Sequence, residues 1–361
     1  GTKWSDGEPF TTTDVAFAFN DMISNKDLNK AFPSTLRSPV SKNPPTFEVV
    51  SDVTFRFTWD DPNFAFVENS SGLRQGGWSK SGVNKLFYPA HWVKQFHGDY
   101  ADKASLDKLM AETESETWPA MLKVKLNGYQ NADYPQLGAW RVIDGSAGTE
   151  WIAERNPYFY AVDTAGNQLP YIDRIHMTLQ ENLESVSLKA VSGEIDFQGR
   201  HMAVQKIPLY RQNADQGNFH LTMWPCPCAN DAMLHINSGY DKDPVIGKLL
   251  RTRDFRGALS LAVDRIEINE IFFLGIGEPK PWVPAKGTLF YPGDDVAAMY
   301  ATRDLAAANA LLDGLGLTKK NADGVRLRPD GSGPLTLHAV LNESYVADFA
   351  AVLEMMSKHW K

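Results

Sequence analysis

The stretch WSDGEPFTTTDVAFAF, residues 4–19, joins a polar turn to the start of a helix. Asp6-Gly7 has the composition of a tight turn. Thr11 and Asp14 have the spacing of a capping box, in which each side chain accepts a backbone N–H of the other residue. The apolar residues after Asp14 recur mostly on one helical face. The stretch therefore predicts a turn that leads directly into an amphipathic helix.

The composition is that of an ordinary globular protein and argues against two classes of partner. The chain has 361 residues, 43% of them hydrophobic, and a formal net charge of -8. The length suggests about two domains. An acidic chain lacks the basic face that nucleic acid requires, so we expect no nucleic-acid partner. No apolar run approaches the roughly 18–20 residues needed to span a bilayer. We expect a chain whose signal peptide is absent from this sequence.

The segments after the first helix alternate between helical and strand patterns. Residues 47–59 predict a β-hairpin centred on Ser51-Asp52. Helical spacing dominates 84–125, and β-rich segments follow at 139–143, 149–155 and 174–179. Further expected elements are a helix over 183–190 that closes at Gly193 and feeds a strand at 194–197, helices at 256–273, 305–315 and 349–361, and a strand at 334–340.

The search for catalytic and metal-binding motifs favours neither an enzyme nor a metalloprotein. The sequence has no G-x-S-x-G, H-E-x-x-H or Walker motif. Cys226 and Cys228 supply at most two soft metal ligands, and they could equally be free thiols or a strained disulfide. We therefore predict no catalytic residues, no metal and no cofactor. Three tryptophans in loop-like contexts are candidate ligand walls instead: Trp78, Trp224 and Trp282.

Six motifs, in order along nearly the whole chain, resemble those of the family 5 extracellular solute-binding proteins of ABC importers. They are KWSDGEPFT (3–11), LGAW with ERNPYFY (137–140 and 154–160), QLPYID (168–173), VSGEID (191–196), FRGALSLAVDR (255–265) and AANALL (307–312). Most of these motifs make turns and caps. They identify a scaffold and do not name a ligand.

The resemblance implies an α/β, two-lobed periplasmic-binding-protein fold of type II with an extra subdomain. It implies the extra subdomain over residues 1–125, the main part of lobe one over 126–247, and the first part of lobe two over 248–361, with a hinge crossing near residues 243–253. Family members extend beyond both ends of this sequence, so we expect the chain to be a fragment that lacks both ends and the fold to be incomplete.

The resemblance also implies a function and a location. A solute binds in an interlobe cleft, the lobes close, and the complex docks on the membrane permease. The expected partners are a small-molecule solute and ABC permease subunits, for a monomer in the periplasm or, lipid-anchored, outside a Gram-positive cell. The expected ligand is an oligopeptide. An oligosaccharide is the alternative within the family, and a sensory binding module or a hydrolase are the alternatives outside it.

Position relative to the family, together with the loop aromatics, selects the candidate ligand contacts. Phe32 follows the first helix in a segment that faces the cleft in the family. The segment 230–237, interpreted as a strand, matches another such segment, and Asp231 could neutralise a peptide amino terminus. The candidate ligand-binding residues are Phe32, Trp78, Trp224, Asn230, Asp231 and Trp282.

Overall fold

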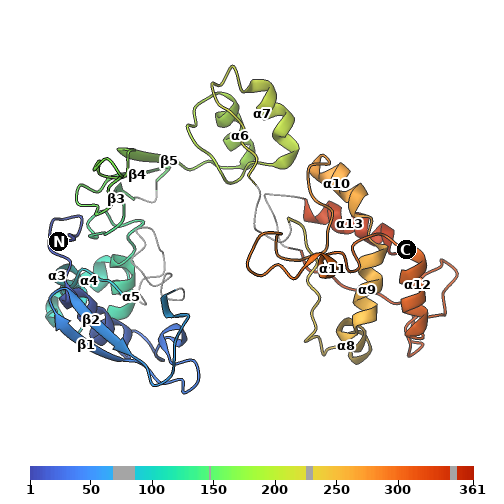
Figure 1. The fold of residues 1–361 in the computed structure, drawn as a ribbon, viewed down its shortest axis with the longest axis horizontal. Helices are drawn as coiled ribbons and strands as arrows, with labels where there is room; N and C mark the ends of the chain where they lie inside the picture. Colours follow the sequence, from blue (N-terminus) through green and yellow to red (C-terminus); the bar gives the residue numbers. More distant parts are fainter. Residues whose placement is uncertain (68–85, 146–147, 225–230, 342–347) are drawn as a thin grey trace. The chain divides into compact units, whose positions relative to one another are not determined.

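The computed structural model describes residues 1–67, 86–145, 148–224, 231–341 and 348–361 (Figure 1). The chain forms two compact units, Gly1–Leu179 and Gln180–Lys361. Cys226 and Cys228 lie outside the described residues. In the part of the chain that the structure describes, no helix has the length and hydrophobicity to cross a bilayer.

The first unit begins with the predicted turn and helix. Helix α1 (Thr12–Phe17) starts at Thr11, whose hydroxyl accepts a hydrogen bond from the Thr13 amide at 3.2 Å. The Asp14 carboxylate accepts from the Thr11 amide at 3.0 Å, which confirms the capping box. The helix then widens into a π-helical turn, η1 (Ala18–Ile23), in which the Ser24 amide donates to the Phe19 carbonyl at 3.1 Å.

The predicted hairpin is confirmed and carries an aromatic cluster. Strands β1 (Thr46–Ser51) and β2 (Thr54–Thr58) pair antiparallel. The ring of Phe47 stacks on Phe19 of η1 with centroids 5.1 Å apart, and Phe57 lies 5.5 Å from the same ring. A short 3-10 turn, η2 (Ser34–Leu36), closes the loop between η1 and β1. The hairpin and the π-helical turn therefore share one aromatic core.

The helical pattern predicted over 84–125 is confirmed where the structure describes it. Its elements are α3 (Ala90–Val93), η4 (Lys94–Phe96), α4 (Lys103–Glu112) and α5 (Trp118–Lys125). Side chains of Asp102 and Thr117 cap α4 and α5. Tyr88, Ala90, Val93 and Leu122 of this region join Phe17, Ala18 and Met22 in one core.

A three-stranded antiparallel sheet completes the first unit, and its strands are those predicted. Strands β3 (Trp140–Asp144), β4 (Glu150–Arg155) and β5 (Arg174–Thr178) lie in the order β3-β4-β5. Val142, Trp151 and Ala153 are buried on one face. The Trp151 indole donates to the Tyr129 carbonyl at 2.7 Å, which ties the sheet to the segment after α5.

The second unit opens with α6 (Leu183–Val191), η5 (Val204–Lys206) and α7 (Ile207–Asn213). Gly193 follows α6 with a left-handed φ of +75°, and a Cβ there would lie 2.4 Å from the Gly217 carbonyl oxygen. The predicted helix end at this glycine is confirmed. The strand predicted at 194–197 is wrong, because a strand needs a hydrogen-bonded partner and no described segment pairs with these residues.

The remaining described helices are α8 (Pro244–Arg251), α9 (Arg253–Ala262), α10 (Arg265–Phe273), α11 (Asp294–Ala297), α12 (Leu305–Gly314) and α13 (Phe349–His359). The predicted continuous helix over 256–273 is wrong. Val263 is extended, and Asp264 starts α10 by accepting from the Glu267 amide at 3.0 Å. An aspartate inside the apolar pattern offers the backbone a cap, which competes with helix continuation.

The strand predicted at 334–340 is also wrong. Pro334 forms an isolated bridge with Leu327, and the Leu335 amide donates to the Arg326 carbonyl at 2.7 Å, but no described segment pairs with residues 336–340. Leu335 and Leu337 nevertheless pack against the buried Leu249, Phe255 and Leu317. The alternation of apolar and polar residues therefore reflects which side chains face the core, even though the backbone hydrogen bonds do not continue past Leu335 as a strand.

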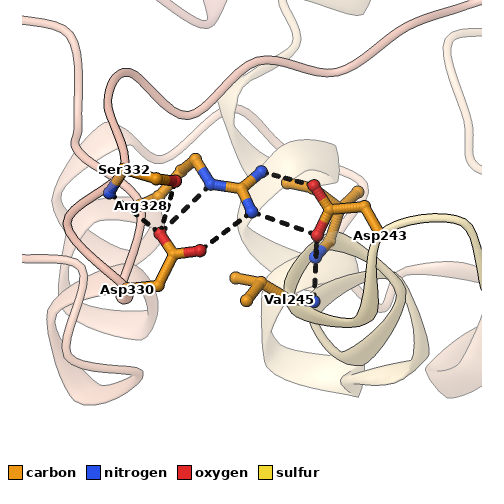
Figure 2. Close-up of polar contacts among 6 residues, drawn as sticks. Asp243, Val245, Arg328, Asp330 and Ser332 are labelled. Carbon is orange, nitrogen blue, oxygen red and sulfur yellow. Dashed lines mark hydrogen bonds and ion pairs between the residues drawn. The ribbon is translucent and has the colours of Figure 1, made fainter.

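Asp243 caps α8 and connects it to the loop after residue 327. Its carboxylate accepts from the Val245 and Ile246 amides at 3.0 and 3.1 Å. Figure 2 shows the Arg328 guanidinium between Asp243 and Asp330, with Asp243 contacts of 2.7 and 3.1 Å. These hydrogen bonds lower the pKa of Asp243 and of Asp330 below that of an ordinary carboxyl, and raise the pKa of Arg328.

Candidate functional site

Phe32 is held in place by a neighbouring arginine. Its carbonyl accepts a hydrogen bond from Arg37 Nε at 3.1 Å. The Arg37 guanidinium also lies 5.7 Å from the centroid of the Phe32 ring, within cation–π range. On its other side the ring meets Phe19 edge-on, with centroids 5.8 Å apart. Both the backbone and the ring of Phe32 are therefore fixed before any ligand arrives.

Phe32 lines a hollow of about 350 Å³ in the first unit. The apolar lining comes from η1, from Phe32 itself and from two successive prolines before β1. Polar side chains from the segment after η1 complete it. The lining residues are Phe19, Ile23, Ser24, Lys26, Asn29, Lys30, Phe32, Pro44 and Pro45. A volume of this size suits one small ligand or one residue of a longer ligand.

Trp224 lies in the second unit beside a residue that the sequence reasoning missed. Its ring centroid is 6.4 Å from that of Phe197, at an interplanar angle of 45°. Both side chains are largely exposed, at 73% for Trp224 and 75% for Phe197. Exposed paired rings are suited to stacking against the apolar face of a ligand. Phe197 directly follows the VSGEID motif, and nothing in its local sequence distinguishes it from a core phenylalanine.

Two further predicted contacts in the second unit lie at the surface. Trp282 is 59% exposed, and Asp231 is exposed. No hydrogen bond or ring contact among the described residues joins Trp224, Asp231 and Trp282 to one another. The strand interpretation of 230–237 is wrong for the described residues 231–237, which have no strand partner. Trp78 and Asn230 lie outside the described residues.

A second hollow, of about 360 Å³, lies beside the three-stranded sheet. Ion pairs border it: Arg141 with Glu154, and Arg155 with Asp173 at 3.4 Å. Gln168 also lines it, and its amide donates to the Pro157 and Phe159 carbonyls at 2.9 Å each. The two arginines and the two carboxylates around this hollow balance each other in charge. The lining therefore carries no net charge that would attract an ionic ligand.

The described residues form neither an accessible hydrolytic site around Ser187 nor a metal-binding group. Ser187 has its hydroxyl 3.0 Å from the Tyr210 hydroxyl and 3.3 Å from Lys206 Nζ, but Ser187 is only 2% exposed. This cluster ties α6 to α7, and a substrate cannot reach it. Across the described ranges, no group of three or more His, Cys, Asp or Glu side chains could hold a metal ion.

Comparison with known proteins identifies a family for the entire sequence. Residues 1–361 match the family described as bacterial extracellular solute-binding proteins, family 5 Middle. This match confirms the resemblance inferred from the six motifs, since the chain is covered from end to end.

Three relatives illustrate the range of the match. A periplasmic alpha-galactoside-binding protein of Rhizobium meliloti is 27% identical over 96% of this chain and 48% of its own length. The structure of an oligopeptide-binding protein, OppA, has a TM-score of 0.70 and 32% identity over 100% of this chain and 54% of its own. The periplasmic binding protein MelB of Agrobacterium fabrum, solved with stachyose, has a TM-score of 0.58 and 23% identity over 92% of this chain and 47% of its own.

These likenesses confirm the predicted fold class. The described residues form a mixed α/β structure, and the solved neighbours are periplasmic binding proteins of the OppA type. The chain spans about half the length of the curated relatives it matches.

Proposed function

The chain belongs to the bacterial extracellular solute-binding proteins of family 5, and on that premise we propose that it takes part in capturing a solute and delivering it to the permease of an ABC importer. Capture by closure of two lobes around the ligand is the mechanism we propose. Only contacts that differ between the open and closed states can drive that closure. The division into residues 1–125, 126–247 and 248–361 belongs to this proposal.

We propose an oligopeptide as the ligand. The observation that carries this choice is the match to an oligopeptide-binding protein at 32% identity over the whole chain. The Phe32 hollow supports it, because a space of about 350 Å³ accepts one residue of an extended chain. Phe32, Trp224, Asp231 and Trp282, together with Trp78 and Asn230, remain the proposed ligand contacts.

An oligosaccharide is a second candidate, and one structural observation favours it. The exposed Phe197 and Trp224 rings form a platform on which the apolar face of a sugar can stack. The alpha-galactoside-binding relative, at 27% identity, supports the same reading. The two candidates differ in which unit supplies the decisive contacts: the Phe32 hollow for a peptide, and the ring platform for a sugar.

The proposed setting follows from the family. We propose a protein that acts outside the cytoplasmic membrane, in the periplasm or lipid-anchored on the cell surface, as a monomer. Its partners are the solute and the permease subunits. We propose that it needs no cofactor and catalyses no reaction, because the family it belongs to is described by solute binding.

A thermal-shift screen tests the ligand class. A ligand present at about 100 times its dissociation constant adds roughly 2.7 kcal/mol to stability. Mixed tripeptides are compared with raffinose and stachyose. For a peptide ligand, Phe32→Ala weakens the shift more than Trp224→Ala does; for a sugar ligand, Trp224→Ala has the larger effect. Tyr160→Ala, which removes an exposed ring in the first unit, is the matched control. If neither class shifts the protein, both ligand proposals are wrong.

A further inference from the structure

We propose that the Phe32 hollow binds an apolar group that carries a carboxylate, with Lys26 and Lys30 supplying the complementary charge. This inference rests on the proposed function for its role in capture, and it names the chemistry that one part of the site selects. The apolar floor, the unpaired charges and the π-helical turn each contribute to it.

The floor of the hollow is apolar and rigid. Phe19 and Ile23 are buried side chains of η1, and Pro45, which lines the same hollow, is also buried. The Asn29 side-chain amide donates to the Met22 and Ile23 carbonyls at 2.9 and 3.3 Å. It therefore supplies hydrogen-bond donors to the last carbonyls of the π-helical turn. A π-helical turn is rare and occurs frequently at functional sites. The geometry that forms this wall is therefore itself an indication of binding.

Among the residues that the structure describes, the two lysines at the rim have no ion-pair partner. Lys26 and Lys30 are exposed, and neither makes a hydrogen bond or an ion pair with another described residue. The residues that line the hollow include no aspartate or glutamate. By contrast, Lys103 and Lys206 each pair with a carboxylate elsewhere in the chain. An anion at this rim would find two ammonium groups that no described carboxylate holds in an ion pair, over a surface of low polarity.

The size of the hollow limits what can carry that anion. About 350 Å³ accommodates a single side chain with its attached carboxylate rather than a whole oligomer. The carboxyl-terminal residue of a peptide has this chemistry, and so does a free aromatic acid. The shared feature is a carboxylate on an apolar body, and the two sources are separated by experiment.

Isothermal titration of the full chain compares matched acids and amides. Ala-Ala-Phe is compared with its carboxamide, and 3-phenylpropionate with 3-phenylpropanamide. We expect each acid that uses the hollow to bind about tenfold more tightly than its amide. Binding of the peptide acid alone identifies a peptide terminus as the source. Binding of both acids with similar affinity identifies a free organic acid as sufficient.

Variants tie the preference to the lysines. In Lys26→Gln/Lys30→Gln the preference for the acid should disappear while the amide still binds. Lys123→Gln, an exposed lysine on α5, removes one charge elsewhere in the same unit and should leave the preference intact. The preference should also shrink as salt rises from about 50 to 500 mM, because the charges are at the surface. A double variant that keeps the acid preference overturns the assignment to Lys26 and Lys30.

The outcomes separate this inference from the proposed function. If acid and amide bind equally, solute capture stands and the carboxylate subsite is wrong. If the peptide acid and amide, the phenyl compounds and the oligosaccharides all fail to bind, the proposed function and this inference fall together. Both substituted lysines are exposed, so an unchanged melting temperature of the double variant excludes misfolding as the cause of a lost preference.

Discussion

Asp14 in the first unit and Asp243 in the second both lie at the start of a helix, Asp14 as the third residue of α1 and Asp243 as the cap of α8, but their carboxylates accept from different kinds of donor. Asp14 is buried and accepts from three neutral donors: the Trp4 indole at 3.2 Å, the Thr11 amide at 3.0 Å and the Ala90 amide at 2.9 Å. Asp243 is partly exposed and accepts from two amides and a guanidinium (Figure 2). A buried carboxylate can therefore be held without a cation when enough N–H groups converge on it.

The contrast extends to what each aspartate connects. Asp14 joins the opening turn, α1 and the start of α3, so one side chain organises segments up to 76 residues apart. Asp243 and Arg328 join α8 to a loop 85 residues away. In the first case the connection lies inside the core. In the second it lies near solvent, where salt and protons can reach it.

The largest expected effect is that of Asp14→Ala. The substitution leaves the Trp4, Thr11 and Ala90 N–H groups without their acceptor inside the protein, and it should lower the free energy of unfolding by about 3–5 kcal/mol. Urea unfolding of the variant and the wild type measures it. Thr11→Ala is the control, since it removes only a cap and should cost about 1 kcal/mol. If Asp14→Ala lowers the free energy of unfolding no more than Thr11→Ala does, the buried hydrogen bonds of Asp14 do not stabilise the core as described.

Gly247→Ala tests whether α8 depends on close packing as well as on Asp243. A Cβ at Gly247 would lie 2.2 Å from the Tyr240 carbonyl oxygen, a backbone atom that cannot move freely. Overpacking of this kind should cost about 2–3 kcal/mol. Gly314→Ala, near the end of α12, is the matched control because its Cβ would meet nothing within 4 Å. If the two variants are equally stable, the backbone at Tyr240 can move away from the added Cβ at little cost.

Asp243→Ala should have a smaller effect than Asp14→Ala, because its partners regain water. Loss of the cap should lower the melting temperature by about 2–4 °C. Asp243→Asn keeps a capping side chain and removes only the charge. Its melting temperature should therefore lie between those of Asp243→Ala and the wild type. Calorimetry of the three proteins orders them. If Asp243→Asn is as unstable as Asp243→Ala, the ion pair with Arg328 matters more than the cap.

The smallest effect is the pH dependence of the Asp243 region. The pKa of Asp243 in the folded chain lies below its ordinary value of 3.8. A depressed pKa contributes stability that is fully present above pH 4 and is lost as the pH falls through the folded value. The stability difference between wild type and Asp243→Asn should therefore shrink below about pH 4. A difference that stays constant down to pH 2 would show that Arg328 does not favour the ionised carboxylate.

Predictions from the sequence succeeded where the signal and the structure are both local. The capping box of Thr11 and Asp14 lies within four residues, and the hairpin strands are joined by a turn at Ser51-Asp52. The second role of Asp14 could not be predicted, because its bond to Ala90 depends on how distant segments pack. The break at Asp264 was missed because the apolar periodicity continues through it, although an aspartate within such a pattern is a recognisable cap signal.

The candidate site was less predictable than the fold. Phe32 was selected by position relative to the family, and the structure adds the hollow around it. Lys26 and Lys30 carry no motif, and only the wall built by η1 and the two prolines sets them at one rim. Phe197 reaches Trp224 across 27 residues of chain, a distance over which no periodicity indicates contact.

The π-helical turn at Ala18–Ile23 has a consequence for chain length. Its wide turn holds one more residue than an α-helical turn, so deletion of a single residue would restore the α-helix. Because the wide turn absorbs that residue, the side chains after the deletion would keep their direction. Had the chain without the deletion continued in α-helical geometry instead, each of these side chains would be rotated by about 100° around the helix axis, and Ile23 would leave the wall of the Phe32 hollow. The wide turn is thus what accommodates one extra residue without turning Ile23 away from the hollow.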